Sequence, residues 1–106
     1  MAKYLVNATY TAEGTQGLLK EGGTSRQKLI EQMVAKLGGS LECFYYCFGH
    51  SDVIAIADVP DAITAAAISM GINSAGAVKL SMTSLLSPSD IDEATKKTVG
   101  YRPPGT

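Results

Sequence analysis

The sequence predicts an α+β fold, a ferredoxin-like βαββαβ sandwich with an extra helix at its C-terminal end. Residues 3–10 and 77–85 alternate apolar and polar side chains, as half-buried strands do. Residues 41–48 and 53–57 form a hairpin in which almost every side chain is apolar or aromatic. Helical patterns separate this hairpin from the outer strands. The 106 residues suit a single domain, with residues 1–99 as core and 100–106 as an extended tail.

The first half of the chain predicts a strand, a long connection and a helix. In the first strand, the even positions from 4 to 10 share one face and the odd positions share the other. Residues 11–23 contain several glycines, which predicts a loop with at most one helical turn. A helix then begins at Thr24, where Gln27 stands at capping-box spacing, and it ends at the glycine pair 38–39.

The second half predicts a helix, a strand and a short terminal helix. Pro60 and Asp61 begin an alanine-rich helix, since proline is tolerated in the first turn. Residues 77–85 complete the sheet, and Pro88–Lys97 form a helix that is acidic at its start and basic at its end. Right-handed crossovers place both longer helices on one sheet face, with the first and third strands central.

Composition argues against several classes of partner. The net charge is −1, no cluster of Lys and Arg is present, and Arg26, Lys28 and Lys36 are interpreted as the solvated face of one helix. We therefore expect no nucleic-acid partner. No apolar run approaches the roughly 20 residues of a membrane span. The N-terminus reads directly into a strand, which predicts a cytoplasmic protein without a membrane partner.

The two cysteines and the single histidine predict no metal site. Cys43 and Cys47 are four residues apart on one strand, roughly 13 Å, which is too far for a mutual disulfide. We expect free thiols, because a zinc site would need more Cys or His nearby than His50 alone. The glycines at 14, 17, 22 and 23 are too scattered to cradle a phosphate, and no cofactor is expected.

The hairpin at residues 41–57 has no clearly wet face. A domain of this size has too few elements to cover both faces of such a hairpin. We therefore expect one face to pack under the helices and the other to pack against a second copy of the chain, as a homodimer or a higher homo-oligomer.

Several short motifs are spread over nearly the whole chain: Thr11-Ala-Glu-Gly14, Lys36-Leu-Gly-Gly39, Phe44-Tyr45, Phe48-Gly49, Asp52-Val53, Pro60-Asp61 and the tail Gly100-Tyr-Arg-Pro-Pro-Gly105. In these motifs the chain resembles the GYD-domain family, small bacterial proteins of mostly unassigned function. At the hairpin, Gly49 and Asp52 match the family's name motif, while Ser51 stands where tyrosine is usual. The resemblance implies a ferredoxin-like fold that self-associates as a dimeric α+β barrel.

The hairpin turn carries the only polar cluster with catalytic residue types. His50 could act as a general acid or base, and Asp52 could orient it. The alternative is a plain turn in which Ser51 and Asp52 bond nearby backbone amides.

A second candidate site lies on the sheet and the tail. The aromatic residues of the hairpin alternate across the sheet, so one set should join the polar residues of the outer strands in a mixed surface. Such a surface suits a small, partly apolar ligand or a homodimer interface. Arg102, in its proline-stiffened tail, is either part of a frayed end or an arm that reaches another subunit or an anionic ligand. The candidate ligand-binding residues are Asn7, Thr9, Tyr46, Ser81 and Arg102.

These observations leave three functions open. The first is a homo-oligomeric small-molecule-binding or accessory protein. The second is a cofactor-free isomerase, lyase or monooxygenase with His50 as acid and base, Asp52 as its orienter, and Tyr46 and Arg102 on the substrate. The third is a structural subunit without a ligand.

Overall fold

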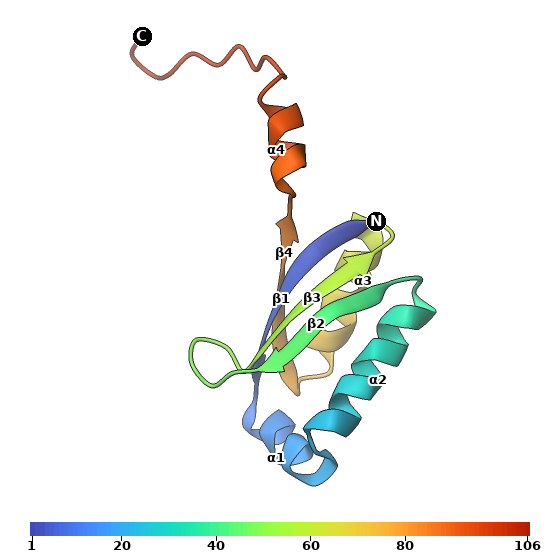
Figure 1. The fold of residues 1–106 in the computed structure, drawn as a ribbon. Helices are drawn as coiled ribbons and strands as arrows, with labels where there is room; N and C mark the ends of the chain where they lie inside the picture. The colour runs from blue at the N-terminus through green and yellow to red at the C-terminus, as the bar shows by residue number, and fades with distance from the viewer.

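The computed structural model describes residues 1–106 as four strands and four helices (Figure 1). The four strands form a single sheet with the order β2-β3-β1-β4, and every neighbouring pair is antiparallel. This order is that of a split βαβ arrangement, consistent with the ferredoxin-like fold predicted, and it places β1 and β3 at the centre as expected. The elements are β1 (Ala2–Tyr10), α1 (Ala12–Glu21), α2 (Gly23–Lys36), β2 (Ser40–Tyr46), β3 (Val53–Val59), α3 (Ala62–Ser74), β4 (Val78–Leu85) and α4 (Pro88–Ala94).

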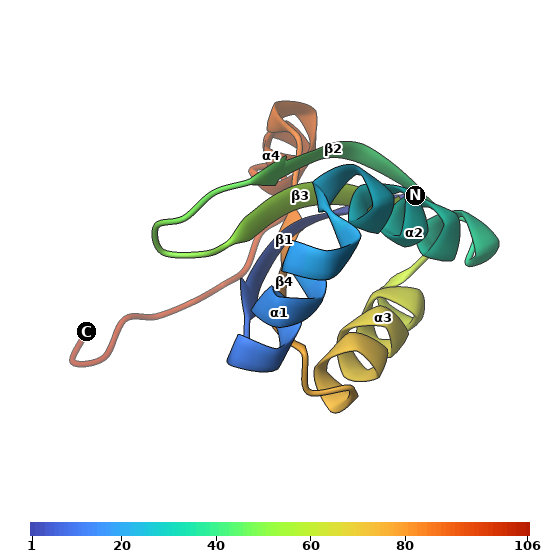
Figure 2. The same cartoon turned by 90° about the horizontal axis from the view of Figure 1, so that it is seen from below.

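The helices α1, α2 and α3 lie on one side of the sheet, as Figure 2 shows. The burial pattern of β3 agrees with this arrangement. Val53, Ala55, Ala57 and Val59 are buried, while the residues between them are only half-buried. The register carries the same alternation to β1, where Val6 lies opposite Ala55. The sheet therefore has one face covered by helices and one face that no element covers, which we call the open face.

The core under the helices is thin. Nine apolar residues are buried, and four of them are alanines. They gather in two small clusters, one around Val53 near the hairpin end of the sheet and one around Val59 beneath α3. The large side chains that pack against both clusters are only partly buried, and unfilled space remains between the sheet and the helices.

The connection at residues 11–23 is a ten-residue helix, so the predicted loop is wrong. Thr11 caps this helix by accepting a hydrogen bond from the Gly14 amide at 3.2 Å. The same residue ties the helix to the start of β4, since its own amide donates to the Ala77 carbonyl at 3.0 Å. Glycines lower helix propensity, but tertiary contacts override that preference here.

The second helix begins one residue before the predicted Thr24 cap. Gly22, with φ of 86°, is the only residue between α1 and α2, and it gives α2 no side-chain cap. Gln27 donates to Glu31 at 3.0 Å instead of closing a capping box, so that prediction is also wrong. The predicted end is confirmed, because Gly38 adopts φ of 85° directly after the helix.

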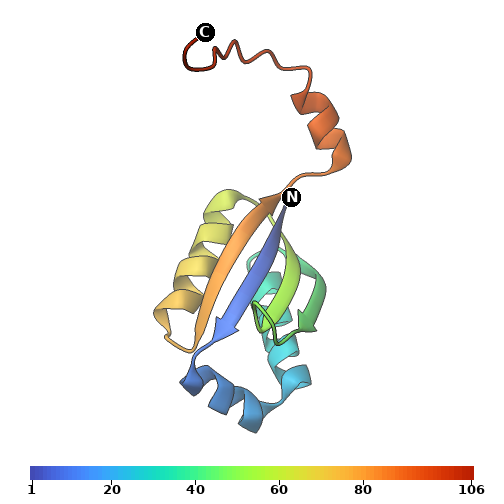
Figure 3. The same cartoon turned by 90° about the vertical axis from the view of Figure 1, so that its left-hand side faces the viewer.

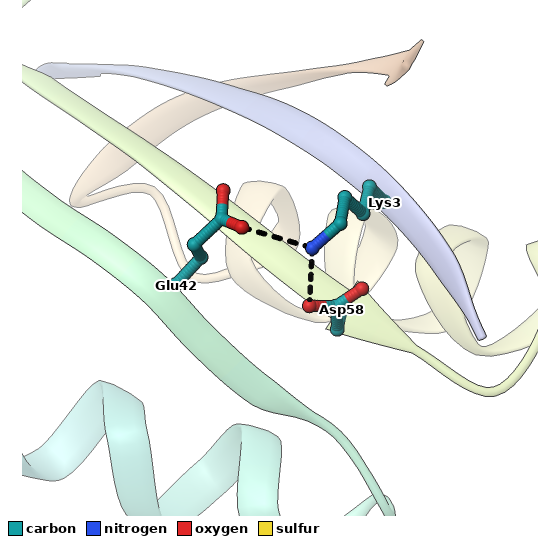
Figure 4. Close-up of polar contacts among 3 residues, drawn as sticks. All are labelled: Lys3, Glu42 and Asp58. Carbon is teal, nitrogen blue, oxygen red and sulfur yellow. Dashed lines mark hydrogen bonds and ion pairs between the residues drawn. The ribbon is translucent and has the colours of Figure 1, made fainter. Parts of the chain in front are cut away.

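A register shift in β2 brings three charged residues together on the open face. The pairing of β2 with β3 slips between Leu41 and Cys43, which is a β-bulge at Glu42. Figure 4 shows the result: Lys3 Nζ lies 3.0 Å from Glu42 Oε1 and 2.9 Å from Asp58 Oδ2. The hydrogen bond that Lys3 donates to Asp58, followed by the one that it donates to Glu42, raises the pKa of Lys3.

The last residues extend away from the rest of the molecule. Every residue from 86 to 106 is exposed, and all hydrogen bonds of their side chains stay within this segment. Figure 3 shows α4 and the tail projecting beyond the end of β4. The radius of gyration is 17.0 Å, whereas a compact chain of about this length has about 13 Å. We call residues 86–106 the C-terminal arm. None of the four helices has the length and apolar character needed to cross a membrane.

Candidate functional site

An apolar cavity lies between the sheet and the helices. Of the 17 residues that line it, 16 are hydrophobic. The sheet contributes Val6, Ala8, Tyr10, Leu41, Phe44, Val53, Ala55, Ala57, Val78, Leu80 and Met82, and the helices contribute Arg26, Ile30, Met33, Val34, Ile68 and Ile72. The centre of a water molecule can reach about 60 Å³ of this space.

Small side chains are the reason that this space exists. Ala8 of β1 and Ala55 and Ala57 of β3 lie on the covered face of the two central strands and line the cavity. On α3, Ala67, Gly71 and Ala75 follow at four-residue spacing and line the groove between α2 and α3. Measured in the same way as the inner cavity, this groove holds about 480 Å³.

Arg26 is the only lining residue of the inner cavity that is not hydrophobic. It comes from the first turns of α2 and also lines both the α2–α3 groove and a groove beside α1. Its residue surface is half-buried, and its guanidinium forms no ion pair or hydrogen bond within the protein. A single cation therefore lies where the three spaces meet.

Tyr46 lies beside the cavity on the helix-covered face. Its hydroxyl donates a 3.0 Å hydrogen bond to the carbonyl of Gly23, and its ring meets that of Phe44 edge-on at 5.4 Å. Burial, and next the neighbouring Tyr10, raise the pKa of Tyr46 to about 12. The positive charge of Arg26 lowers the pKa of Tyr46, so the guanidinium lies within electrostatic reach of the phenol.

The groove beside α1 differs from the α2–α3 groove in its charge. Glu13 and Glu21 line it together with Arg26, and it holds about 250 Å³ by the same measure. The α2–α3 groove has no acidic lining residue. Of the two grooves that share Arg26 with the cavity, one is thus acidic and the other carries only the Arg26 charge.

The predicted catalytic pair is not joined in the structure. The Asp52 carboxylate accepts a hydrogen bond from the Tyr10 amide at 2.8 Å, and the Asp52 amide donates to the Ala8 carbonyl at 2.8 Å. The His50 imidazole is exposed and makes no hydrogen bond within the protein. Asp52 thus anchors the hairpin turn to the end of β1, which is the turn alternative stated above.

The predicted ligand residues fall in three separate places. Asn7, Thr9 and Ser81 share the open face, where Asn7 pairs with Ser81 in the register of β1 and β4. Tyr46 lies on the opposite, helix-covered face. Arg102 lies in the C-terminal arm, where its Nη1 donates to the Thr106 carbonyl oxygen.

Two residues at the cavity were missed by the sequence reasoning. Tyr10 was assigned only to the sheet, and Arg26 was assigned to the solvated face of its helix. The spacing contained the signal for Arg26, because positions 26, 30, 33 and 37 share one helical face and three of them are apolar. All four line the cavity or its α2–α3 groove.

Both cysteines are free thiols, as expected, and Cys47 Sγ donates to the Ser51 carbonyl at 3.2 Å. No group of three or more His, Cys, Asp or Glu side chains is arranged to hold a metal ion.

Comparison with known proteins identifies the family. The model of the GYD domain matches residues 4–95, which include the cavity, α4 and all of the sheet except the first two residues of β1. The tail at 100–105, which was one of the marks of the resemblance, lies outside the match. No curated protein and no solved structure is significantly similar to the chain. The match covers most of the 106 residues, and the chain therefore belongs to the GYD domain family.

Proposed function

We propose that this protein is a homo-oligomeric small-molecule-binding protein that takes its ligand between the sheet and the helices. The observation that carries the proposal is the cavity lined by 16 hydrophobic residues and one arginine. Ligand sites are commonly concave, mostly apolar and supplied with a few placed polar groups. The open sheet face has polar candidates but no such enclosed space among them.

An empty cavity of this kind lowers the stability of the folded protein. Protein interiors are close-packed, and atoms that line a void lose their dispersion partners. Longer side chains in place of Ala8, Ala55 and Ala57 would fill the space, yet all three positions carry alanine. A bound ligand would supply the missing contacts and would explain why the alanines leave this void.

A second copy of the chain is the proposed cover of the open face. This face presents Leu5, Ile54, Ile56 and Tyr45, and the Tyr45 side chain remains 68% exposed. The Lys3, Glu42 and Asp58 charges lie at one end of it. An apolar centre with a charged margin is the anatomy of a protein interface. Two such sheets packed face to face would form a dimeric α+β barrel.

The enzymatic alternative gains no support from the hairpin turn. A general acid or base needs a partner that orients it, and the carboxylate assigned to that role is bonded to the Tyr10 amide. We therefore place the ligand in the cavity and not at His50.

Titration with 1-hexanol, followed by NMR of isoleucine methyl groups, tests the binding proposal. We expect shift changes at Ile68 and Ile72, which line the cavity, and none at Ile54 or Ile56 on the open face. Ala67→Leu should weaken the response because Ala67 lines the α2–α3 groove. Ala66→Leu, at an exposed neighbouring position on α3, is the matched control. Absence of any response, or a response confined to the open face, would refute the proposal.

A further inference from the structure

We infer that the ligand is a small monocarboxylate whose apolar part fills the inner cavity and whose anionic head binds Arg26 from the α2–α3 groove. This inference rests on the proposed function. It goes further by fixing the charge of the ligand, its approximate size and the opening by which it enters.

The charge of the ligand follows from the state of Arg26. A guanidinium carries five N–H donors in a planar fork that matches a carboxylate with two parallel hydrogen bonds. Here it lies half-buried at the edge of an apolar cavity with no acceptor from the protein. Both ion pairs of the chain belong to Lys3, far from this site on the other sheet face. A bound carboxylate would supply the missing acceptors.

The direction of entry follows from the charges around the openings. An anion that approached beside α1 would pass through a groove that Glu13 and Glu21 line together with Arg26. Ten residues line the α2–α3 groove, eight of them hydrophobic, and Arg26 is its only charged member. Like charges repel most strongly where water is scarce. The α2–α3 groove is thus the electrostatically open path for an anion.

The size of the ligand follows from the inner space. One water molecule needs about 10–15 Å³ of the volume that its centre can reach. The 60 Å³ of the inner cavity therefore accommodates about four to six non-hydrogen atoms. A short alkyl chain or a single ring fits this limit, with the carboxylate outside it in the groove. A long-chain fatty acid does not fit.

Three probes of equal chain length separate charge from apolar burial: hexanoate, 1-hexanol and hexylamine, each titrated by isoleucine-methyl NMR at fixed ionic strength. We expect hexanoate to bind about tenfold more tightly than hexanol, because charge-assisted hydrogen bonds are roughly twice as strong as neutral ones. Hexylamine should bind most weakly. Added salt should weaken hexanoate binding and leave hexanol binding nearly unchanged.

Arg26→Gln should lower the affinity for hexanoate to that for hexanol and leave hexanol binding unchanged. Lys28→Gln, at an exposed position on the same helix, is the matched control and should change neither. Hexanol binding with no preference for hexanoate would overturn this inference and leave the proposed function standing. Binding of none of the probes would overturn both. The wild-type series and its salt dependence decide the question even if Arg26→Gln does not fold.

Discussion

Asp52 joins the hairpin turn to the cavity through three hydrogen bonds. Its carboxylate accepts from Tyr10, its amide donates to Ala8, and its carbonyl accepts from Cys47 at 2.9 Å. Tyr10 and Ala8 both line the cavity. The carboxylate thus fixes the end of β1, and with it one wall of the proposed binding site.

Replacement of Asp52 by alanine should lower the free energy of unfolding by about 1–3 kcal/mol, since the half-buried Tyr10 amide loses its acceptor. His50→Ala should change it by less than about 0.5 kcal/mol, because the imidazole is exposed and unbonded. Urea denaturation of both variants measures the difference. A larger effect at His50 than at Asp52 would contradict the structural role assigned to this turn.

Tyr46 should make stability fall at alkaline pH. Its pKa is raised from 10.0 to about 12 in the folded protein, chiefly by burial. The folded state therefore holds this proton after the unfolded state has lost it, so the contribution is complete below pH 10 and declines between pH 10 and 12. In urea denaturation across this range, wild type should lose stability more steeply than Tyr46→Phe. Equal slopes would show that the phenol is not shielded from water.

Residue patterns in the sequence predicted the strand faces but not the site. The alternation of β1 correctly separated its even from its odd positions, because a period of two is a direct geometric property of a strand. Arg26 was misassigned because a charged residue on an otherwise apolar helical face is ordinarily solvated. Its position at the cavity depends on the crossing of α2 over the sheet, which no local pattern encodes.

The helix α1 depends on a close approach between its backbone and β4. A Cβ atom at Gly14 would overlap the carbonyl oxygen of Ala77, the residue that also accepts from Thr11. At Gly17, three residues further along the same helix, a Cβ atom would meet no other atom within 4 Å. Packing against β4 therefore requires glycine at position 14, whereas no contact requires it at position 17.

Gly14→Ala and Gly17→Ala should change stability in opposite directions. The first forces the helix away from β4 and should lower the melting temperature. The second adds a methyl group in open space and should stabilise the protein by up to about 1 kcal/mol, the helix-propensity difference between alanine and glycine. Thermal unfolding followed by circular dichroism measures both. A melting temperature that falls equally in both variants would mean that α1 is not a packed helix.

The same two glycines explain why α1 could not be predicted. Local propensity disfavours a helix with glycine at positions 14 and 17. The packing against Ala77, some 60 residues away in sequence, makes glycine necessary at the first of them. In contrast, β1, β3, α3 and β4 were predicted within a few residues, since each has a strong hydrophobic period or a clear cap such as Asp61.

At the scale of the whole molecule, the open face and the C-terminal arm are two surfaces that the single chain leaves uncovered. The helix α4 has a complete capping box at Ser87 but buries no residue. Isolated helices this short are marginal in water. The second copy proposed above, which the hairpin pattern in the sequence also predicts, would cover the open face and could stabilise the arm.

Tyr45→Lys should dissociate the proposed homodimer, because it places a charge in the apolar centre of the open face. We expect light scattering of wild type to give twice the 11.1 kDa chain mass and the variant to give the chain mass itself. Ile63→Lys is the matched control, since Ile63 is 81% exposed on the outer side of α3. An 11.1 kDa particle for the wild-type protein at micromolar concentration would contradict self-association.

The alanines of the two central strands are positions where a substitution would affect both stability and the proposed ligand site. Ala8, Ala55 and Ala57 are almost inaccessible to solvent, yet their short side chains stop before the space above them is filled. Valine at any of the three would convert void into contact and would be expected to raise thermal resistance. The same methyl groups would occupy the space proposed for the ligand. If the proposed ligand binds there, thermal stability and ligand binding draw on the same small volume, and alanine at these three positions leaves that volume to the ligand.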